Sequence, residues 1–167
     1  MRSVLPVRLL AIGQVLFTIA YFSYMLYISF SWGFTPRMVQ ILVTDSIYLL
    51  LIISAAGLFF LKTWGWWVTV ILYGKLLMSK LIGTGTEWFL LLSGTIAEKW
   101  RWDIFFADLF IILLYTVILA CFFLGRIRRL FNVHEAGKKM AFLVTIGIIL
   151  LYSIYFVTAF WLIVQLG

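Results

Sequence analysis

The chain alternates long apolar stretches with short polar connectors, and this pattern predicts helices that cross a membrane. A spanning helix needs about 20 predominantly apolar residues. Five stretches approach or exceed that length, at about residues 9–31, 38–61, 66–83, 104–125 and 140–166. We therefore expect an all-α integral membrane protein, a bundle of five transmembrane helices that forms one domain over residues 1–167.

The composition agrees with this pattern. Of the 167 residues, 65% are hydrophobic and 11% are charged, whereas soluble domains are about 45–50% apolar and about 25% charged. The first apolar stretch is longer than the core of a secretory signal and no small-residue cleavage site follows it, so we expect an uncleaved span. The expected location is the cell membrane, in a multi-pass arrangement.

The third stretch decides the topology, because it is short and contains Lys75 and Lys80. The alternative is a four-span protein in which this stretch lies on or dips into the membrane. Basic residues favour the cytoplasmic side. With five spans and a cytoplasmic N-terminus, Arg2, Arg8, Lys62, Arg126, Arg128, Arg129, Lys138 and Lys139 lie inside, and Arg37, Lys99 and Arg101 lie outside. Four spans would nearly abolish this bias, so we predict five spans and an extracytoplasmic C-terminus.

Tryptophan placement gives a second test, because indole rings favour the headgroup level of a bilayer. All eight tryptophans lie near predicted span ends. Trp32, Trp88, Trp100, Trp102 and Trp161 are expected at the outer side, and Trp64, Trp66 and Trp67 at the inner side. The pattern supports the five-span topology.

Three connectors carry structural information. Residues 62–65 form a tight inner turn, so the second and third spans should pack as antiparallel neighbours. The outer segment 84–103 contains Trp88–Leu92, which is too short to span and indicates an interfacial or re-entrant element. The inner loop 126–139 is basic and is expected to contact anionic lipid headgroups. The lipid contacts would come from Arg126, Arg128, Arg129, Lys138 and Lys139.

Four charged side chains fall inside predicted spans, namely Asp45, Lys75, Lys80 and Asp108. Each costs about 2.5 to 3.5 kcal/mol at a helix centre, so such groups are expected to face the bundle interior and to pair. A helix rises about 1.5 Å per residue, which places all four in the outer half and each Asp level with a Lys. We expect Asp45 to pair with Lys75, and Asp108 with Lys80.

Tyrosine hydroxyls add to the same level of the bundle. Helical spacing places Tyr48 one turn from Asp45 and Tyr115 two turns from Asp108, and Tyr73 lies on the third span with the lysines. The outer half of the bundle is therefore expected to be more polar than the inner half. This polar cluster would act as interhelical glue, as a path for an ion or small solute, or as a docking site for another membrane protein. Lys80 would alternatively extend to the outer headgroups.

Enzyme signatures are absent from the sequence. Cys121 is the single cysteine, expected to be a small buried apolar side chain, and His134 is the single histidine, so neither a metal site nor a cofactor is expected. The net charge of +7 is dispersed between apolar stretches, which argues against a nucleic-acid partner.

Two function classes remain after these exclusions. One is a non-enzymatic accessory, regulatory or protective protein that packs against a membrane partner or a second copy of itself. The other is an oligomeric small transporter or channel subunit with a polar path in its outer half. An enzyme that acts through the outer carboxylates Glu87, Glu98 and Asp103 is a weaker third reading.

Overall fold

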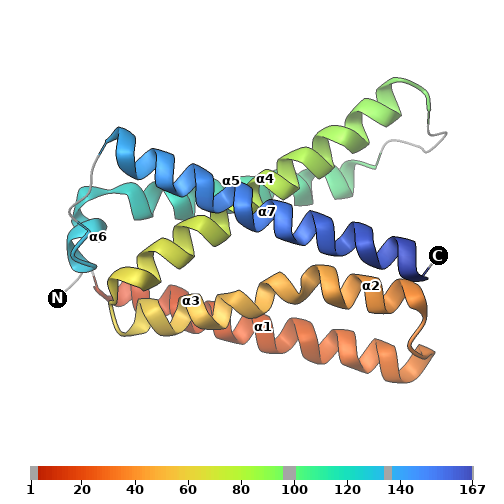
Figure 1. Ribbon diagram of the computed structural model, residues 1–167, viewed down its shortest axis with the longest axis horizontal. Helices are drawn as coiled ribbons and strands as arrows, with labels where there is room; N and C mark the ends of the chain where they lie inside the picture. The colour runs from red at the N-terminus through yellow and green to blue at the C-terminus, as the bar shows by residue number, and fades with distance from the viewer. Residues whose placement is uncertain (1–3, 96–100, 134–136, 167) are drawn as a thin grey trace.

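The computed structural model describes residues 4–95, 101–133 and 137–166, and this part of the chain is helical without strands. The long helices run roughly side by side, and α1 begins at one end of the molecule while α7 finishes at the other (Figure 1). In chain order the elements are α1 (Val4–Trp32), α2 (Pro36–Asp45), the 3-10 helix η1 (Ser46–Leu49), α3 (Leu50–Phe59), α4 (Thr63–Leu92), α5 (Trp102–Phe123), α6 (Gly125–Leu130) and α7 (Lys138–Leu166).

Within the described residues, five helical segments are long and apolar enough to cross a membrane: α1, α2 to α3 as one unit, α4, α5 and α7. This confirms five helices of the length and apolar character that spanning requires, including the third. Helix α4 is central, because it packs against α3, α5 and α7, while α1 packs on α3 and α2 packs on α7. Residues 96–100, within the predicted outer segment, and His134 lie outside the described residues.

The second span is not one regular helix. It begins with Thr35 and Pro36, where the Thr35 hydroxyl accepts a hydrogen bond from the Met38 amide at 3.3 Å, and proline occupies the first helical turn, where it costs no hydrogen bond. The helix then changes from α to 3-10 geometry at Ser46–Leu49 before it resumes as α3. The sequence pattern predicted the span but not this change, which lies directly after Asp45.

Helix α4 is longer than the sequence pattern predicted. It continues through Gly83 without a break and ends at Leu92, so Trp88–Leu92 is the last part of this helix rather than a separate element. Its 30 residues rise about 45 Å, which exceeds the roughly 30 Å hydrocarbon core of a bilayer. Gly94 follows with a positive φ of 70°, and the Thr95 amide donates to the Leu90 carbonyl at 3.1 Å, as in a glycine-terminated helix.

The tight turn between α3 and α4 depends on two glycines. A Cβ added to Gly57 would collide with the Cα of Gly65, and a Cβ added to Gly65 would collide with the Gly57 backbone. The two helix backbones therefore touch directly at this point, as the predicted hairpin requires. Leu61 takes the left-handed conformation with φ 52°, while the Lys62 amide donates to the Gly57 carbonyl at 2.9 Å.

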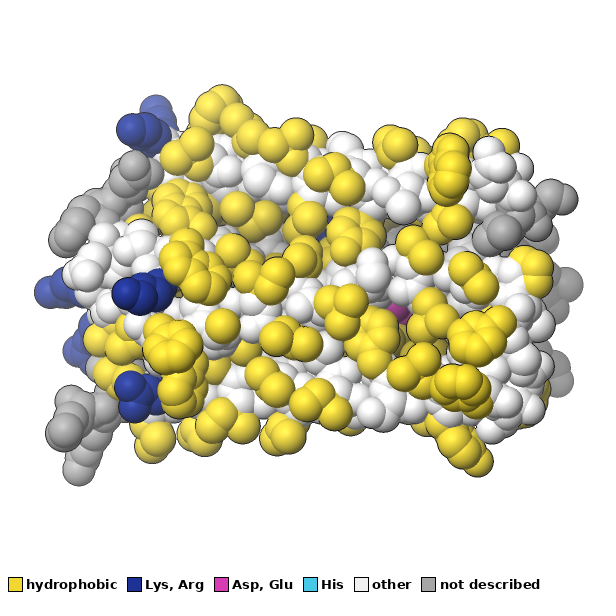
Figure 2. Space-filling model, turned by 60° about the horizontal axis from the view of Figure 1, so that its bottom comes forward, with side chains coloured by type: hydrophobic (Ala, Val, Ile, Leu, Met, Phe, Trp, Pro, Cys, Tyr) yellow, Lys and Arg dark blue, Asp and Glu magenta, His cyan; other side chains and the backbone are white. Residues whose placement is uncertain are grey.

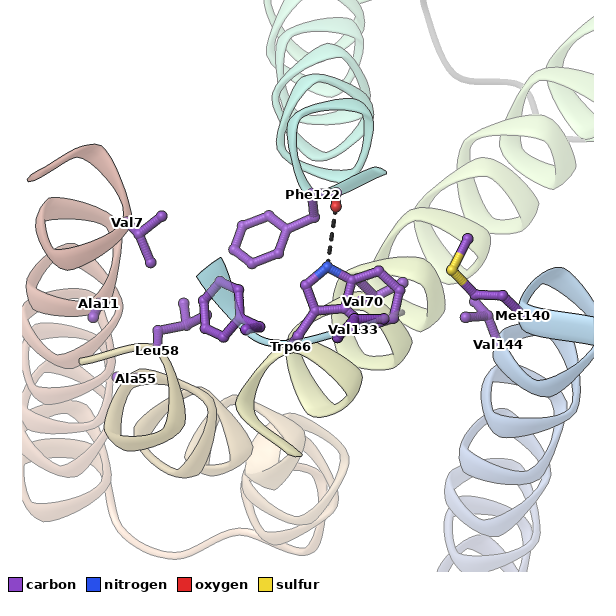
Figure 3. Packing of buried hydrophobic residues seen from close by; sticks show 11 residues of the cluster. Val7, Ala11, Ala55, Leu58, Trp66, Val70, Phe122, Val133, Met140 and Val144 are labelled. Carbon is purple, nitrogen blue, oxygen red and sulfur yellow. Dashed lines mark hydrogen bonds between the residues drawn. The ribbon is translucent and has the colours of Figure 1, made fainter. Parts of the chain in front are cut away.

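The main hydrophobic core lies at the end of the bundle that contains this turn. Trp66 is fully buried there, and its indole Nε1 donates a hydrogen bond to the Phe122 carbonyl at 3.0 Å (Figure 3). Trp66 is therefore a core residue that faces neighbouring helices, and its depth in a bilayer stays a prediction. The last turn of α5 leaves the Phe122 carbonyl free to accept the indole proton. The cluster comprises Val7, Ala11, Ala55, Leu58, Trp66, Val70, Phe122, Phe131, Val133, Met140 and Val144.

Candidate functional site

The predicted pair between α4 and α5 is present. Lys80 Nζ lies 2.5 Å from Asp108 Oδ1, and the Thr84 hydroxyl, one turn further along α4, donates to Asp108 Oδ2 at 2.8 Å. Asp108 is 7% exposed, so both oxygens of a buried carboxylate have partners on the neighbouring helix. This network confirms the predicted pairing and adds Thr84, which the sequence analysis did not single out.

The predicted contact between Asp45 and Lys75 is wrong. Asp45 instead accepts a hydrogen bond from the Tyr21 hydroxyl of α1, while Lys75 Nζ lies 5.0 Å from the centre of the Tyr155 ring of α7. The prediction assumed a straight α-helix through Asp45, whereas the chain changes to 3-10 geometry immediately after it. Among the described residues, Lys75 Nζ has neither a hydrogen-bond nor an ion-pair partner.

Although they do not touch, Asp45 and Lys75 line the same cavity. This polar cavity has a volume of about 320 Å³ and lies between α2, η1, α4 and α5. Its lining consists of Thr44, Asp45, Ile47, Tyr48, Lys75, Leu76, Ser79, Lys80, Ile111 and Tyr115. The structure thus brings together five of the seven predicted cluster residues, and Asp108 joins them through its contact with Lys80.

The seventh residue, Tyr73, lines an adjoining apolar groove of about 380 Å³. There the Gln14 side chain donates from Nε2 to the Tyr73 hydroxyl at 3.2 Å, and the Tyr73 ring packs edge-on against Tyr115 with centroids 5.7 Å apart. Gln14 is 3% exposed, and its Oε1 has no hydrogen-bond partner. Gln14 was missed by the sequence analysis, although an amide within an apolar span was the available signal.

The groove and the polar cavity adjoin each other, because both are lined by Tyr48, Leu76, Ile111 and Tyr115. The groove continues between α1 and α5, where its edge residues Gly13, Phe17 and Leu114 are exposed. The polar cavity thus places charged groups inside the bundle, and the adjoining groove places an apolar surface at the lateral face of the protein.

The basic connector is partly helical and partly packed. It contains α6, and the following Phe131 and Val133 are buried in the main core. Four of its predicted lipid-contacting residues, Arg126, Arg129, Lys138 and Lys139, are exposed. The fifth, Arg128, is half-buried, and its Nη1 lies 3.8 Å from Met140 Sδ. On the face shown in Figure 2, the Lys and Arg side chains gather at this same end of the molecule.

Other candidate residues lie apart from the cavity. Asp103 forms an exposed ion pair with Arg101 at 2.8 Å, Glu87 is exposed on α4, and Glu98 lies outside the described residues. Cys121 is exposed on α5, so its expected burial was wrong. The reason is that α5 is a peripheral helix, and most of its residues are not buried against other helices. Within the described residues, no group of three metal-ligating side chains is present.

Comparisons of the chain with protein-family models, with curated protein sequences and with solved structures find no match. The function is therefore inferred from the geometry of the cavity and the groove.

Proposed function

We propose that the protein is a non-enzymatic, multi-pass protein of the cell membrane that binds a small solute in its polar cavity, as a subunit of a small transporter would. The observation that carries this proposal is that Lys75 and Asp45 line one cavity without contacting each other. A charge inside a membrane span costs about 2.5 to 3.5 kcal/mol, and such residues usually mark a substrate or ion path. Lys75 is 7% exposed and retains its hydrogen-bonding capacity for a ligand.

The two ends of the bundle differ in a way that favours a binding site over an open channel. The cavity lies on one side of Tyr73, while the other side is filled by the core around Trp66, Leu58 and Phe131, all fully buried. Solute could reach Lys75 from the cavity side, but the packed core closes the opposite side. Transport would require this core to rearrange, and a single chain of this size would act as an oligomer.

The proposed orientation has a cytoplasmic N-terminus and an extracytoplasmic C-terminus. It is supported by the gathering of basic side chains at the end that holds α6 and the start of α7 (Figure 2). Basic residues next to spans favour the cytoplasmic side, and they attract anionic lipid at about 1 kcal/mol per charge. In this orientation the polar cavity lies in the outer half of the membrane.

Water access to the cavity is the property that tests the proposal. In a Cys121→Ser background, Ser79→Cys places a thiol of nearly unchanged size in the cavity lining, and the adjacent Met78→Cys places one on the exposed apolar surface. We expect a membrane-impermeant maleimide, added outside intact cells, to label Ser79→Cys at least tenfold faster than Met78→Cys. Equal protection of both thiols would contradict a solute cavity.

A second candidate is the accessory role, in which the protein packs against a membrane partner or another copy of itself. One observation favours it: α5 has only two buried residues, Asp108 and Phe122, and presents Thr116 and Ala120 on its exposed surface, a spacing that permits close helix approach. The small residues Ser54, Ala55 and Gly57, by contrast, are buried in contacts within the chain. Equal protection of the two introduced thiols would favour this role.

A further inference from the structure

We infer that the polar cavity and the apolar groove together bind one amphiphile that carries a zwitterionic headgroup and a single hydrocarbon chain. This inference rests on the proposed function, because it names the ligand class of the same cavity. The combined volumes, about 320 Å³ and about 380 Å³, fall within the range of roughly 300–1,000 Å³ that is typical of small-molecule sites. A chain that extends into lipid needs no further protein volume.

The headgroup assignment follows from the charges in the polar cavity. Lys80 is already neutralised by Asp108, which leaves Lys75 and Asp45 as opposite charges that face one space without a direct contact. A ligand with only a negative charge would pair with Lys75 but would leave the Asp45 carboxylate opposed to it. A headgroup with both a phosphate and an ammonium satisfies both residues, because the phosphate accepts from Lys75 and the ammonium donates to Asp45.

The chain assignment follows from the groove. Its floor is apolar, with Leu51 and Leu76 buried, and its edge between α1 and α5 is exposed at Phe17 and Leu114. In a bilayer this edge meets acyl chains rather than water. A hydrocarbon chain can therefore enter sideways from the membrane while its headgroup reaches the polar cavity.

The test measures binding of radiolabelled 1-oleoyl-lysophosphatidylethanolamine to the purified full-length protein in lipid nanodiscs. We expect saturable binding of one molecule per chain, weakened at least tenfold by Lys75→Met and at least tenfold by Asp45→Asn. The matched controls are Lys62→Met and Asp103→Asn, which remove exposed charges that are not part of the cavity lining. These controls should bind as the unaltered protein does. Binding that is unchanged by both cavity variants would overturn the inference.

Two analogues separate the parts of the inference. Oleate keeps a chain and an anion but lacks the ammonium, and phosphoethanolamine keeps the headgroup but lacks the chain. Both should compete at least tenfold less well. If oleate competes equally, the zwitterionic assignment is wrong. If phosphoethanolamine competes equally, the chain assignment is wrong but the proposed solute site stands. If neither analogue nor the lysolipid binds, the inference fails, and labelling of Ser79→Cys decides separately whether the solute cavity exists.

A second measurement does not depend on charge-altering variants. Leu114→Cys lies in the groove lining, whereas the adjacent Leu113→Cys is exposed outside it. In the Cys121→Ser background, the lysolipid should slow reaction of Leu114→Cys with a membrane-soluble maleimide and leave Leu113→Cys unaffected. Equal rates at both positions with saturating lysolipid would contradict occupation of the groove.

Discussion

At the scale of single residues, Asp108 illustrates how this protein accommodates a charge within a span. Its two carboxylate oxygens are taken by Lys80 at 2.5 Å and Thr84 at 2.8 Å, which lie four residues apart and hence on one face of α4. The carboxylate thereby joins α4 to α5, a helix that buries only one other residue, Phe122. The packing of α5 against α4 consequently depends strongly on this one residue, Asp108.

Removing this carboxylate should loosen the contact between α4 and α5. We expect Asp108→Ala to lower the free energy of unfolding in detergent by about 1 to 2 kcal/mol, the size of interhelical polar contacts in membranes. The double variant Lys80→Met with Asp108→Ala should recover part of this loss, because no unpaired charge remains. Thermal unfolding curves measure both changes.

Asp103→Ala is the control, because its pair with Arg101 is exposed, and it should leave the unfolding midpoint unchanged. The single variant Lys80→Met completes the comparison. If the double variant loses as much unfolding free energy as Lys80→Met and Asp108→Ala lose in total when measured separately, the pairing is contradicted.

The sequence allowed the charged residues of the site to be predicted, because an ionisable side chain in an apolar span is conspicuous. It allowed the partner to be predicted only where both helices are regular, as for Lys80 and Asp108. The contact from Tyr21 to Asp45 crosses from α1, whose one charged residue, Arg8, lies near the start of the helix and not at the depth of Asp45. Gln14 is uncharged, so its cost in the membrane is small enough to be overlooked.

At the scale of helices, the turn between α3 and α4 brings two helix backbones into direct contact. Gly57 and Gly65 contact each other through their backbones, and this brings Leu58 and Trp66 into the same core cluster. The contact therefore sets the crossing of α4 over α3, on which the position of Lys75 further along α4 depends.

A methyl group at this contact should force the two helices apart. We expect Gly57→Ala to lower the free energy of unfolding by about 1 to 3 kcal/mol through overpacking. Gly83→Ala is the matched control, because a Cβ there meets nothing within 4 Å, and it should leave stability unchanged or raise it by up to about 1 kcal/mol through helix propensity. Thermal unfolding in the same detergent compares the two. Equal effects of the two substitutions would show that the contact does not matter.

The existence and order of the helices could be predicted from hydropathy, but their ends could not be predicted equally well. Gly94 takes the left-handed conformation just after the end of α4, whereas after the end of α3 this conformation is taken by Leu61, which is not a glycine. The interior glycine Gly83 does not end α4, because a single glycine in a long helix costs only about 1 kcal/mol. Apolar length alone therefore could not place the boundaries of α4.

At the scale of the whole molecule, charge and packing density both change along the long axis of the bundle. The end with α6 combines exposed Arg126, Arg129, Lys138 and Lys139 with the dense core around Trp66. The cavity and the groove lie further along the bundle. An odd number of spans puts the start of the first helix and the end of the last at opposite ends of the molecule, as Figure 1 shows for α1 and α7.

The orientation of this axis can be measured with two exposed positions. In the Cys121→Ser background, Thr95→Cys follows α4 at one end and Lys138→Cys begins α7 at the other. We expect an impermeant thiol reagent to label Thr95→Cys in intact cells, and to label Lys138→Cys only after the membrane is opened. The reverse pattern would overturn either the proposed cytoplasmic N-terminus or the third span, and labelling of both in intact cells would show that α5 does not cross the membrane.

The 3-10 segment Ser46–Leu49 also acts as a geometric offset within the second span. Each residue of a 3-10 helix turns the chain by about 120° and advances it by about 2.0 Å, against about 100° and 1.5 Å in an α-helix. Over these four residues the difference amounts to a screw of about 80° and about 2 Å. Asp45 is thereby rotated relative to α3 by nearly a quarter turn, so the direction of its carboxylate is set by four residues on its C-terminal side.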